Sequence, residues 1–358
     1  MIRKTFSILP ILFASLCCLA VASAMQAPRG IPVREWRKRI PVDNPITTEK
    51  VKLGEALYFD KRLSADGTVS CATCHDPASA FTDRNATAIG TRSNRGTRNA
   101  PTVLNAMFSP TLFWDGRAHS LEEQAKHPLV NASEMGMPDY DAVVARVADD
   151  PDYVQMFRRV FKGRVTIDMI AKAIAAFERT QLSGNSPFDR FIAGNRNAVS
   201  AAQKRGWDLF RGKAKCINCH AFSHGSPFFS DFDFHNTGVA MKALAHTQAT
   251  SDFGRYRVTN RRSDIGAFKT PTLRDVELTA PYMHDGSQKT LLDVVRFYDR
   301  GGEANPYLDR RISPLNLTDE EMNALVEFMR SLTSDEVLRR TQAATPQTRV
   351  AVTLPPRR

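Results

Sequence analysis

The sequence predicts a mainly helical protein built from two similar halves. Apolar residues recur at helical spacing in several segments, and no run alternates between apolar and polar residues as a half-buried strand would. A short cysteine motif occurs once in each half, as 71-CATCH-75 and 216-CINCH-220, and a helical segment precedes each copy. Because a chain of 358 residues is too long for a single core, we expect two domains.

The N-terminal segment, residues 1–24, has the pattern of a secretory signal peptide. Arg3 and Lys4 are followed by an apolar run from Ile8 to Val21 and then by Ala22-Ser23-Ala24, which is typical of a cleavage site. The apolar run is shorter than the ~20 residues of a good membrane-spanning helix, although an uncleaved anchor is the alternative. We therefore expect a mature protein that acts in the periplasm without a membrane span.

Four further segments carry the helical pattern most clearly. Two of them precede the cysteine motifs and two follow them, in the order 48–60, 166–182, 200–216 and 318–332. In the second segment, Ile170, Ile174 and Phe177 share one face of the predicted helix. In the last segment, Thr318 and Glu321 have the spacing of a capping box.

Segments that contain Pro and Gly separate these helices. We expect loops at 183–199 and 224–271, and the first of them marks a domain boundary. The resulting organisation is a signal peptide, an N-terminal domain at 25–190, a C-terminal domain at 191–340, and a disordered tail at 341–358.

The overall charge is basic, with a formal net charge of +11 and a pI near 9.5. The basic residues are scattered in short groups and form no signature of nucleic-acid binding. They indicate either a solvated surface or a surface that meets an anionic protein partner, and we expect no nucleic-acid partner.

The C-x-x-C-H pattern is typical of covalent c-type haem attachment. Both thiols add to the haem vinyl groups, and the following histidine becomes the proximal iron ligand. The motifs assign two sets of residues to two haems, Cys71, Cys74 and His75 in the first half and Cys216, Cys219 and His220 in the second. A four-thiolate zinc site or disulfides would use the same cysteines, but both would leave the two histidines unexplained.

Further motifs occur in a fixed order around these sites, namely 71-CATCHDP-77, 96-GTRNAPTVLNA-106, 113-FWDGR-117, 133-SEMG-136, 216-CINCH-220 and 270-TPTLRDVELTAPYMHDGS-287. Together they make the chain resemble the bacterial di-haem cytochrome c peroxidase and MauG family over roughly residues 35–335. The resemblance implies a mainly α fold of two cytochrome c-like domains, each with one covalently bound c-type haem. It also implies hydrogen peroxide as the oxidant.

The resemblance implies an open site at the first haem. In the peroxidase branch of the family a histidine caps this haem, and Thr91 stands at that position here. No histidine occurs between His75 and His119, so the segment that would supply the cap contains none. His119 and His127 are the alternative sixth ligands.

The resemblance also assigns the chemistry of this open site. Glu134 matches a distal glutamate that moves a proton between the peroxide oxygens, and Gln124 matches a distal glutamine that holds the oxidant. Pro128 matches a proline that the MauG branch keeps near the iron, and Trp114 matches a tryptophan that relays oxidising equivalents between the haems. Without the surrounding motifs, Glu134 would be interpreted as a surface carboxylate in a loop.

A calcium ion between the haems is a further implication of the resemblance. Asn99, Thr279 and Pro281 match the family's site, where one asparagine side chain and two backbone carbonyls bind the ion. Such a hard cation prefers oxygen ligands.

Tyr298 lies in the segment 289-KTLLDVVRFYDRGGE-303, at a position where the peroxidase branch has a methionine ligand and MauG-like proteins have a tyrosine. An anionic phenolate on the second haem iron favours its higher oxidation states, whereas a thioether favours the ferrous state. Two alternatives are a tyrosine that is merely buried on a helix face and ligation by the nearby Met283.

The predicted function is therefore MauG-like. Hydrogen peroxide would generate a bis-Fe(IV) state that oxidises tryptophan or tyrosine side chains of a partner protein. The alternatives are a peroxidase that takes electrons from a small cytochrome c or a cupredoxin, and a di-haem electron carrier without enzymatic activity. Ala214 stands where MauG has an exit tryptophan, so the partner protein is not identified.

Overall fold

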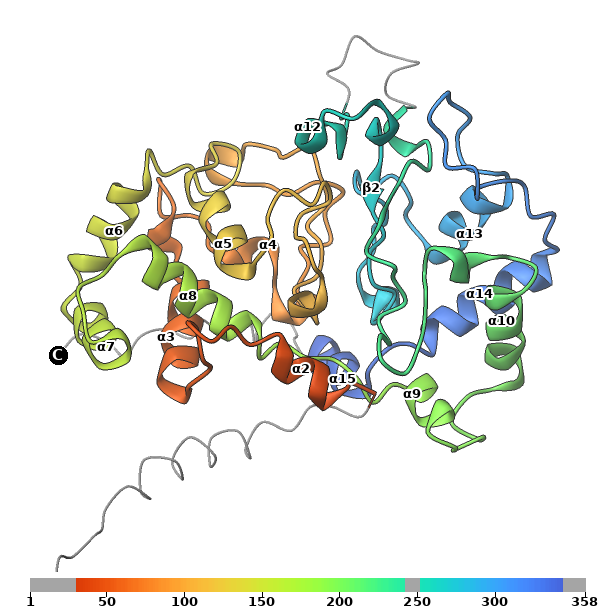
Figure 1. Ribbon diagram of the computed structural model, residues 1–358, viewed down its shortest axis with the longest axis horizontal. Helices are drawn as coiled ribbons and strands as arrows, with labels where there is room; N and C mark the ends of the chain where they lie inside the picture. The colour runs from red at the N-terminus through yellow and green to blue at the C-terminus, as the bar shows by residue number, and fades with distance from the viewer. Residues whose placement is uncertain (1–29, 242–251, 344–358) are drawn as a thin grey trace, which may run out of the picture.

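Helices form most of the regular structure in residues 30–241 and 252–343, the parts of the chain that the computed structural model describes. The first half contains α2 (Val33–Lys38), α3 (Thr48–Phe59), α4 (Cys71–Cys74), α5 (Leu121–Val130), α6 (Tyr140–Ala148), α7 (Pro151–Phe161) and α8 (Ile167–Glu178). The second half contains α9 (Pro187–Ile192), α10 (Ala201–Arg211), α12 (Tyr256–Thr259), α13 (Leu291–Asp299), α14 (Asp319–Arg330) and α15 (Asp335–Ala343). Figure 1 shows the two halves side by side.

The strands of the described ranges are two short pieces, β1 (Phe234–His235) and β2 (Phe268–Lys269). They pair antiparallel with Phe234 opposite Lys269. The predicted mainly helical class is therefore confirmed. The described part of the predicted loop at 224–271 contains these strands, the single turn of α12 and the turn η6 (Arg262–Asp264).

In the first half, α3 crosses α8 at very close range. The crossing point is Gly54, where an added Cβ would lie 1.9 Å from the carbonyl oxygen of Ala173. The ring of Phe177, one turn further along α8, packs beside it against Tyr58 of α3, with ring centroids 4.9 Å apart. Glycine is required at this position because any side chain would separate the two helix backbones.

The second half repeats this crossing with α10 and α14. An added Cβ at Gly206 would lie 1.9 Å from the carbonyl oxygen of Ala324 and 2.7 Å from the Cβ of Phe328. Ala324 and Phe328 thus correspond to Ala173 and Phe177 of the first half. The two halves repeat one plan down to individual residues, as the repeated motif suggests.

Local sequence signals explain where these helices begin. Thr166 caps α8 by accepting a hydrogen bond from Met169 N, and Thr318 forms the predicted capping box with Glu321. The helix predicted at 200–216 is shorter than expected because it ends at Arg211 and the chain turns at Gly212. The predicted loop at 183–199 contains α9, whose Phe188 packs in the core of the second half.

The C-terminal helix α15 returns to the first half. Its Val337 is buried in the first-half core, and the helix contacts the turn η2 (Pro77–Ser79) that follows the first cysteine motif. An ion pair of 2.7 Å between Arg190 and Asp335 joins α9 to the start of α15. Helix α15 ends at Ala343, so the predicted disordered tail at 341–358 begins within a helix. Residues 344–358 and the predicted signal peptide lie outside the described residues.

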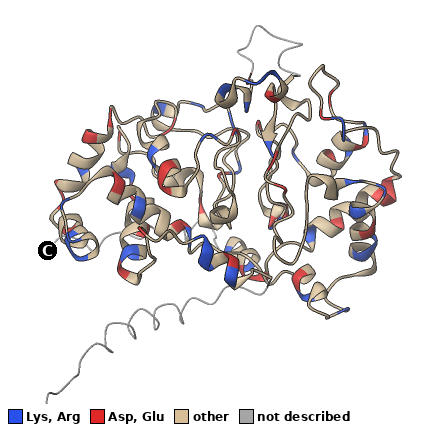
Figure 2. Cartoon of the chain, viewed as in Figure 1, with Lys and Arg blue, Asp and Glu red and all other residues tan. Residues whose placement is uncertain are grey.

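Charged residues of both signs are interspersed along both halves of the chain (Figure 2). Within residues 30–241 and 252–343, no helix combines the length and apolar character needed to cross a membrane.

Candidate functional site

Each half of the molecule contains a cavity lined by its own cysteine motif. The first-half cavity has a volume of about 190 Å³ and is lined by Cys71, Cys74 and His75. The second-half cavity has a volume of about 310 Å³, and its lining includes Cys216, Cys219 and His220. All four thiols are free, and the two pairs line different cavities, so the structure brings together neither a disulfide nor a four-thiolate zinc site.

The motif histidines present one ring nitrogen to each cavity. His75 Nδ1 lies 3.4 Å from the carbonyl oxygen of Phe81, and His220 Nδ1 lies 2.9 Å from that of Phe229. Because a carbonyl oxygen can only accept a hydrogen bond, Nδ1 carries the proton and each Nε2 keeps its lone pair for a metal ion. Burial lowers the pKa of both imidazoles, which keeps them neutral as metal ligation requires.

Helices α5 and α13 cover the two cavities in equivalent ways. Ser120 caps α5 and Thr290 caps α13. In both helices the first, fourth and eighth residues after the cap line the cavity; these residues are Leu121, Gln124 and Pro128 in α5 and Leu291, Val294 and Tyr298 in α13. Pro128 and Tyr298 are therefore counterparts, a ring without a ligand atom over the first cavity and a phenol over the second.

Glu134 lines the first cavity from the loop that follows α5. Its carbonyl oxygen accepts a hydrogen bond of 2.8 Å from the backbone N–H of Thr91, and Gly90 packs so closely that an added Cβ would lie 2.4 Å from the same oxygen. Burial raises the pKa of the Glu134 carboxyl, while the charge of Arg117 and a hydrogen bond from Asn131 partly offset the increase. The side chain is held at the cavity wall, where a carboxyl can exchange a proton with a bound molecule.

The alternative histidines do not reach the first cavity. His119 is exposed and lies outside the lining, and His127 packs its ring edge-on against Phe113, with centroids 5.5 Å apart. Thr91 is buried behind Glu134 and does not line the cavity. Among the residues that the structure describes, His75 is the sole histidine in this lining.

Trp114 lines both cavities. Its indole N–H donates a hydrogen bond of 2.9 Å to the carbonyl oxygen of Asn99, and its own carbonyl accepts one of 2.8 Å from Lys269 N. The ring is thus fixed between the two sites, as the position of a relay requires.

The three residues matched to a calcium site line the second cavity together. The side-chain N–H of Asn99 donates to the carbonyl oxygen of Asn85 at 2.8 Å, which leaves Asn99 Oδ1 available. Within the described residues, no hydrogen bond reaches Asn99 Oδ1 or the carbonyl oxygens of Thr279 and Pro281. These three oxygens are the type of donor set that a hard cation prefers.

The hydroxyl of Tyr298 has no hydrogen-bond partner among the described residues, although the side chain lines the second cavity. Burial raises the pKa of this phenol well above its ordinary value. A hydroxyl without a protein partner in this lining can bind a ligand, and a ferric ion would favour its ionised form. Met283 lines the same cavity, so both candidate ligands of the second haem face one space.

Comparison with known proteins identifies the family. A family model described as di-haem cytochrome c peroxidase matches residues 48–197. The methylamine utilization protein MauG of Methylorubrum extorquens is 40% identical over 323 residues, which cover 88% of this chain and 85% of that protein. The chain belongs to the di-haem cytochrome c peroxidase and MauG family. It is therefore a haem-dependent oxidoreductase of the peroxidase type.

Relatives from both branches of the family align with nearly the whole chain. The cytochrome-c peroxidase IdrP1 of a Pseudomonas species is 36% identical over 355 residues, or 92% of this chain and 93% of that protein. A solved structure described as a MauG-like protein associated with microbial copper homeostasis superimposes with a TM-score of 0.75 at 33% identity, covering 88% of this chain and 96% of that one. Membership in this di-haem family implies two c-type haems, and two free thiols with one neutral imidazole at each cavity fit that group.

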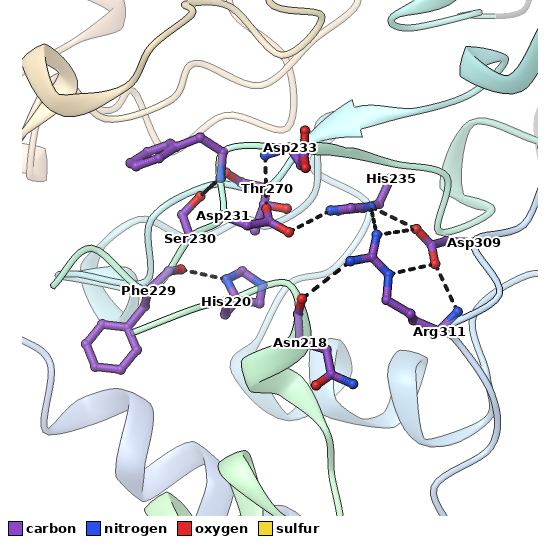
Figure 3. Close-up of polar contacts among 11 residues, drawn as sticks. Asn218, His220, Phe229, Ser230, Asp231, Asp233, His235, Thr270, Asp309 and Arg311 are labelled. Atoms are coloured by element: carbon purple, nitrogen blue, oxygen red, sulfur yellow. Dashed lines mark hydrogen bonds and ion pairs between the residues drawn. The ribbon is translucent and has the colours of Figure 1, made fainter. Parts of the chain in front are cut away.

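A charged cluster lies at the edge of the second haem cavity of this family member (Figure 3). His235 lies between two carboxylates, 3.0 Å from Asp231 Oδ2 and 2.8 Å from Asp309 Oδ2. Arg311 pairs with Asp309 at 2.8 Å and donates to the carbonyl oxygen of Asn218 at 3.4 Å. Burial opposes protonation of His235, whereas its hydrogen bond to Asp231 and the charge of that carboxylate raise its pKa.

Three residues of these sites were not singled out from the sequence. Arg117 lies within the motif 113-FWDGR-117, so its place beside Glu134 could have been inferred from the motif. Glu178 follows Ile170 and Ile174 on the apolar face of α8, a position where a carboxylate is unusual. His235 lies outside the matched motifs and gave no local signal.

Proposed function

We propose that this protein is a periplasmic di-haem oxidoreductase that uses hydrogen peroxide to oxidise tryptophan or tyrosine side chains of a partner protein, as in the MauG branch. The observation that carries the proposal is the pair of counterparts Pro128 and Tyr298. A proline leaves the first cavity without a distal ligand, and a tyrosine supplies the second cavity with an anionic one. A phenolate suits a haem that stores an oxidising equivalent better than one that accepts electrons.

The haem groups would be attached through Cys71 and Cys74 in a domain at 25–190 and through Cys216 and Cys219 in a domain at 191–340. His75 and His220 would be the proximal ligands, and Tyr298 the distal ligand of the second haem. When bound, the haems supply the two-electron chemistry with peroxide. Family membership and the neutral, oriented imidazoles support this assignment.

The first cavity would admit hydrogen peroxide through the space that Pro128 leaves. Gln124 would hold the peroxide, and Glu134 would take a proton from one peroxide oxygen and return it to the other. Trp114, which lines both cavities, would carry oxidising equivalents between the two sites. The oxygen atoms of Asn99, Thr279 and Pro281 would hold a calcium ion beside this path.

A second candidate function is a peroxidase that takes electrons from a small cytochrome c or a cupredoxin. Met283 favours it, because this thioether also lines the second cavity and could replace Tyr298 as the distal ligand. The similarity to proteins named cytochrome c peroxidases is consistent with it.

Spectroscopy of the isolated diferric protein separates the two functions. We expect one high-spin haem and one low-spin haem by electron paramagnetic resonance, and a reaction with peroxide that needs no prior reduction. A co-purifying partner protein should then change in mass after peroxide treatment. Two low-spin haems with a requirement for half-reduction, together with sustained oxidation of reduced cytochrome c, would establish the peroxidase instead.

A further inference from the structure

Glu178 is a buried carboxyl group in the lining of the first cavity, and neither the family motifs nor the proposed mechanism uses it. It is the last residue of α8 and is 7% exposed. The repeat identifies its counterpart, because Phe177 and Phe328 are equivalent and the residues that follow them are Glu178 and Met329. Each of these two residues lines the cavity of its own half. The first haem site thus has the carboxyl of Glu178 where the second has the methionine side chain of Met329.

The carboxyl of Glu178 has no ion-pair partner within the described residues. The adjacent Arg179 directs its guanidinium away to Glu122, in a two-pronged pair with distances of 2.6 and 2.8 Å. Glu178 Oε2 is enclosed and accepts no hydrogen bond. An enclosed carboxyl without a counter-charge is more stable with its proton than without it.

The surroundings of Glu178 leave this proton responsive to charge in the cavity. Burial raises its pKa to about 8, the Arg179 charge opposes this, and the Glu122 charge adds to it. Tyr58 of α3 and Cys71 of α4 are titratable groups that interact electrostatically with Glu178. Neither is a counter-charge, because burial keeps Tyr58 protonated and a thioether at Cys71 would carry no charge.

We propose that Glu178 is a redox-linked proton site of the first haem pocket, which takes up one proton when the pocket gains one electron and releases it when that electron leaves. An added electron makes the pocket more negative, and this charge disfavours a neighbouring carboxylate through a medium of low dielectric. One electron and one proton enter together, so the net charge of the pocket is unchanged. The inference rests on the proposed function in placing a haem in the first cavity.

This arrangement would differ between the two haem sites. Met329 cannot bind a proton, so the second site has no redox-linked proton site at the equivalent position. Reduction at the first site would draw a proton into the pocket that handles peroxide. Reduction of hydrogen peroxide to two water molecules consumes two electrons and two protons, so a proton taken up there is of use to this reaction. The residue would act through the charge balance of the pocket, and it need not touch the peroxide.

The test is a spectroelectrochemical titration of the intact di-haem protein at several pH values around 8, followed at the high-spin bands of the first haem. The wild-type potential should fall with rising pH, approaching about 59 mV for each tenfold change in proton concentration, the one-electron value. Glu178→Gln should flatten this dependence while both haems remain attached. Glu134→Gln removes the other carboxyl of the lining and should retain the pH dependence of the potential. A wild-type slope in Glu178→Gln, or loss of the slope in Glu134→Gln alone, would overturn the inference.

A second variant and an independent measurement test the same proposal. Glu178→Met installs the residue of the second-half counterpart and should flatten the slope equally if the glutamine variant does not fold. Infrared difference spectra of the wild-type protein, reduced minus oxidised, should show a protonated carboxyl band that shifts in heavy water, and the absence of this band contradicts the proposal. The proposed function has a separate readout: a low-spin first haem would refute the open site, whereas the difference in slope between the wild-type protein and Glu178→Gln reports on Glu178.

Discussion

The indole ring of Trp114 meets the imidazole ring of His284 edge-on, with ring centroids 6.4 Å apart. The two residues are counterparts in the repeat, because each lies two residues before the glycine of a D-G turn, Gly116 in the first half and Gly286 in the second. His284 in turn stacks on Phe268 at 3.6 Å. The contact between the halves is therefore built from equivalent aromatic residues, and it places Trp114 in the walls of both cavities.

Trp114→Phe should uncouple the two sites. A phenyl ring fills part of the space but is harder to oxidise than indole, and it loses the hydrogen bond to Asn99, which costs about 1 kcal/mol of stability. Haem content and the initial reaction with peroxide should persist, whereas oxidation of the partner protein should fall sharply. Trp36→Phe is the control, because Trp36 is buried but lines neither cavity. Equal partner oxidation in the two variants would remove Trp114 from the pathway.

Pro128→Tyr should close the first site. The equivalence of Pro128 and Tyr298 places the new phenol where the second cavity has its candidate ligand. We expect the high-spin signal to be replaced by a low-spin one and the reaction with peroxide to be largely lost. Pro128→Ala, which adds no ligand atom, should retain both. A high-spin first haem in Pro128→Tyr would show that α5 and α13 are not functionally equivalent.

Glu134→Gln should slow the reaction with peroxide by roughly 10²–10⁴-fold, the usual contribution of general acid–base catalysis. Because burial raises the pKa of this carboxyl, the carboxylate that accepts the proton is lost at a higher pH than for an exposed glutamate. The wild-type rate should therefore decline as pH falls through the raised pKa, and stopped-flow absorbance should find this decline missing in the variant. Glu49→Gln, at an exposed position, should behave as wild type. An unchanged rate in Glu134→Gln would return Glu134 to a structural role.

Tyr298→Phe should change the absorption spectrum and the potential of the second haem, because the phenolate ligand disappears. Tyr298→Met should raise that potential and abolish oxidation of the partner, since a thioether favours the ferrous state. Tyr282→Phe removes a hydroxyl from the wall of the same cavity and serves as the control. A wild-type spectrum in Tyr298→Phe would show that Tyr298 is not a ligand and would favour Met283.

Gly206→Ala should destabilise the second half. Its Cβ would lie 1.9 Å from a backbone oxygen of α14, so α10 and α14 must separate, at a cost of about 1–3 kcal/mol or more. Thermal unfolding of the holoprotein should show a lower midpoint. Gly225→Ala, where an added Cβ meets no atom within 4 Å, should leave the midpoint unchanged. Similar midpoints for the two variants would mean that the helix crossing is not tightly packed in solution.

Features that depend on neighbours in the sequence could be predicted. The apolar face of α14, with Met322, Leu325, Val326 and Met329, is buried as its spacing indicates, and the capping box at Thr318 is formed. The cysteine motifs indicated which residues would line the two cavities, because the two thiols and the histidine are adjacent in the chain.

Features that depend on residues distant in the sequence could not be predicted from it. Arg179 follows Glu178 directly, yet it pairs with Glu122, which lies 57 residues earlier in the chain. Six of the nine residues in 335-DEVLRRTQA-343 are polar, and nothing in this pattern indicates that Val337 packs in the core of the first half. In both cases the partner is set by the tertiary fold, which local periodicity does not encode.

The position of α15 means that the two halves are not independent modules. The last helix of the described residues covers part of the first half beside η2, next to the first cysteine motif. A fragment that ends near 183 would therefore expose the first-half apolar residues that Val337 covers. A fragment that begins near 183 would contain α15 without the surface on which it packs. Although the chain repeats one plan twice, neither half alone therefore contains all the contacts of its own core.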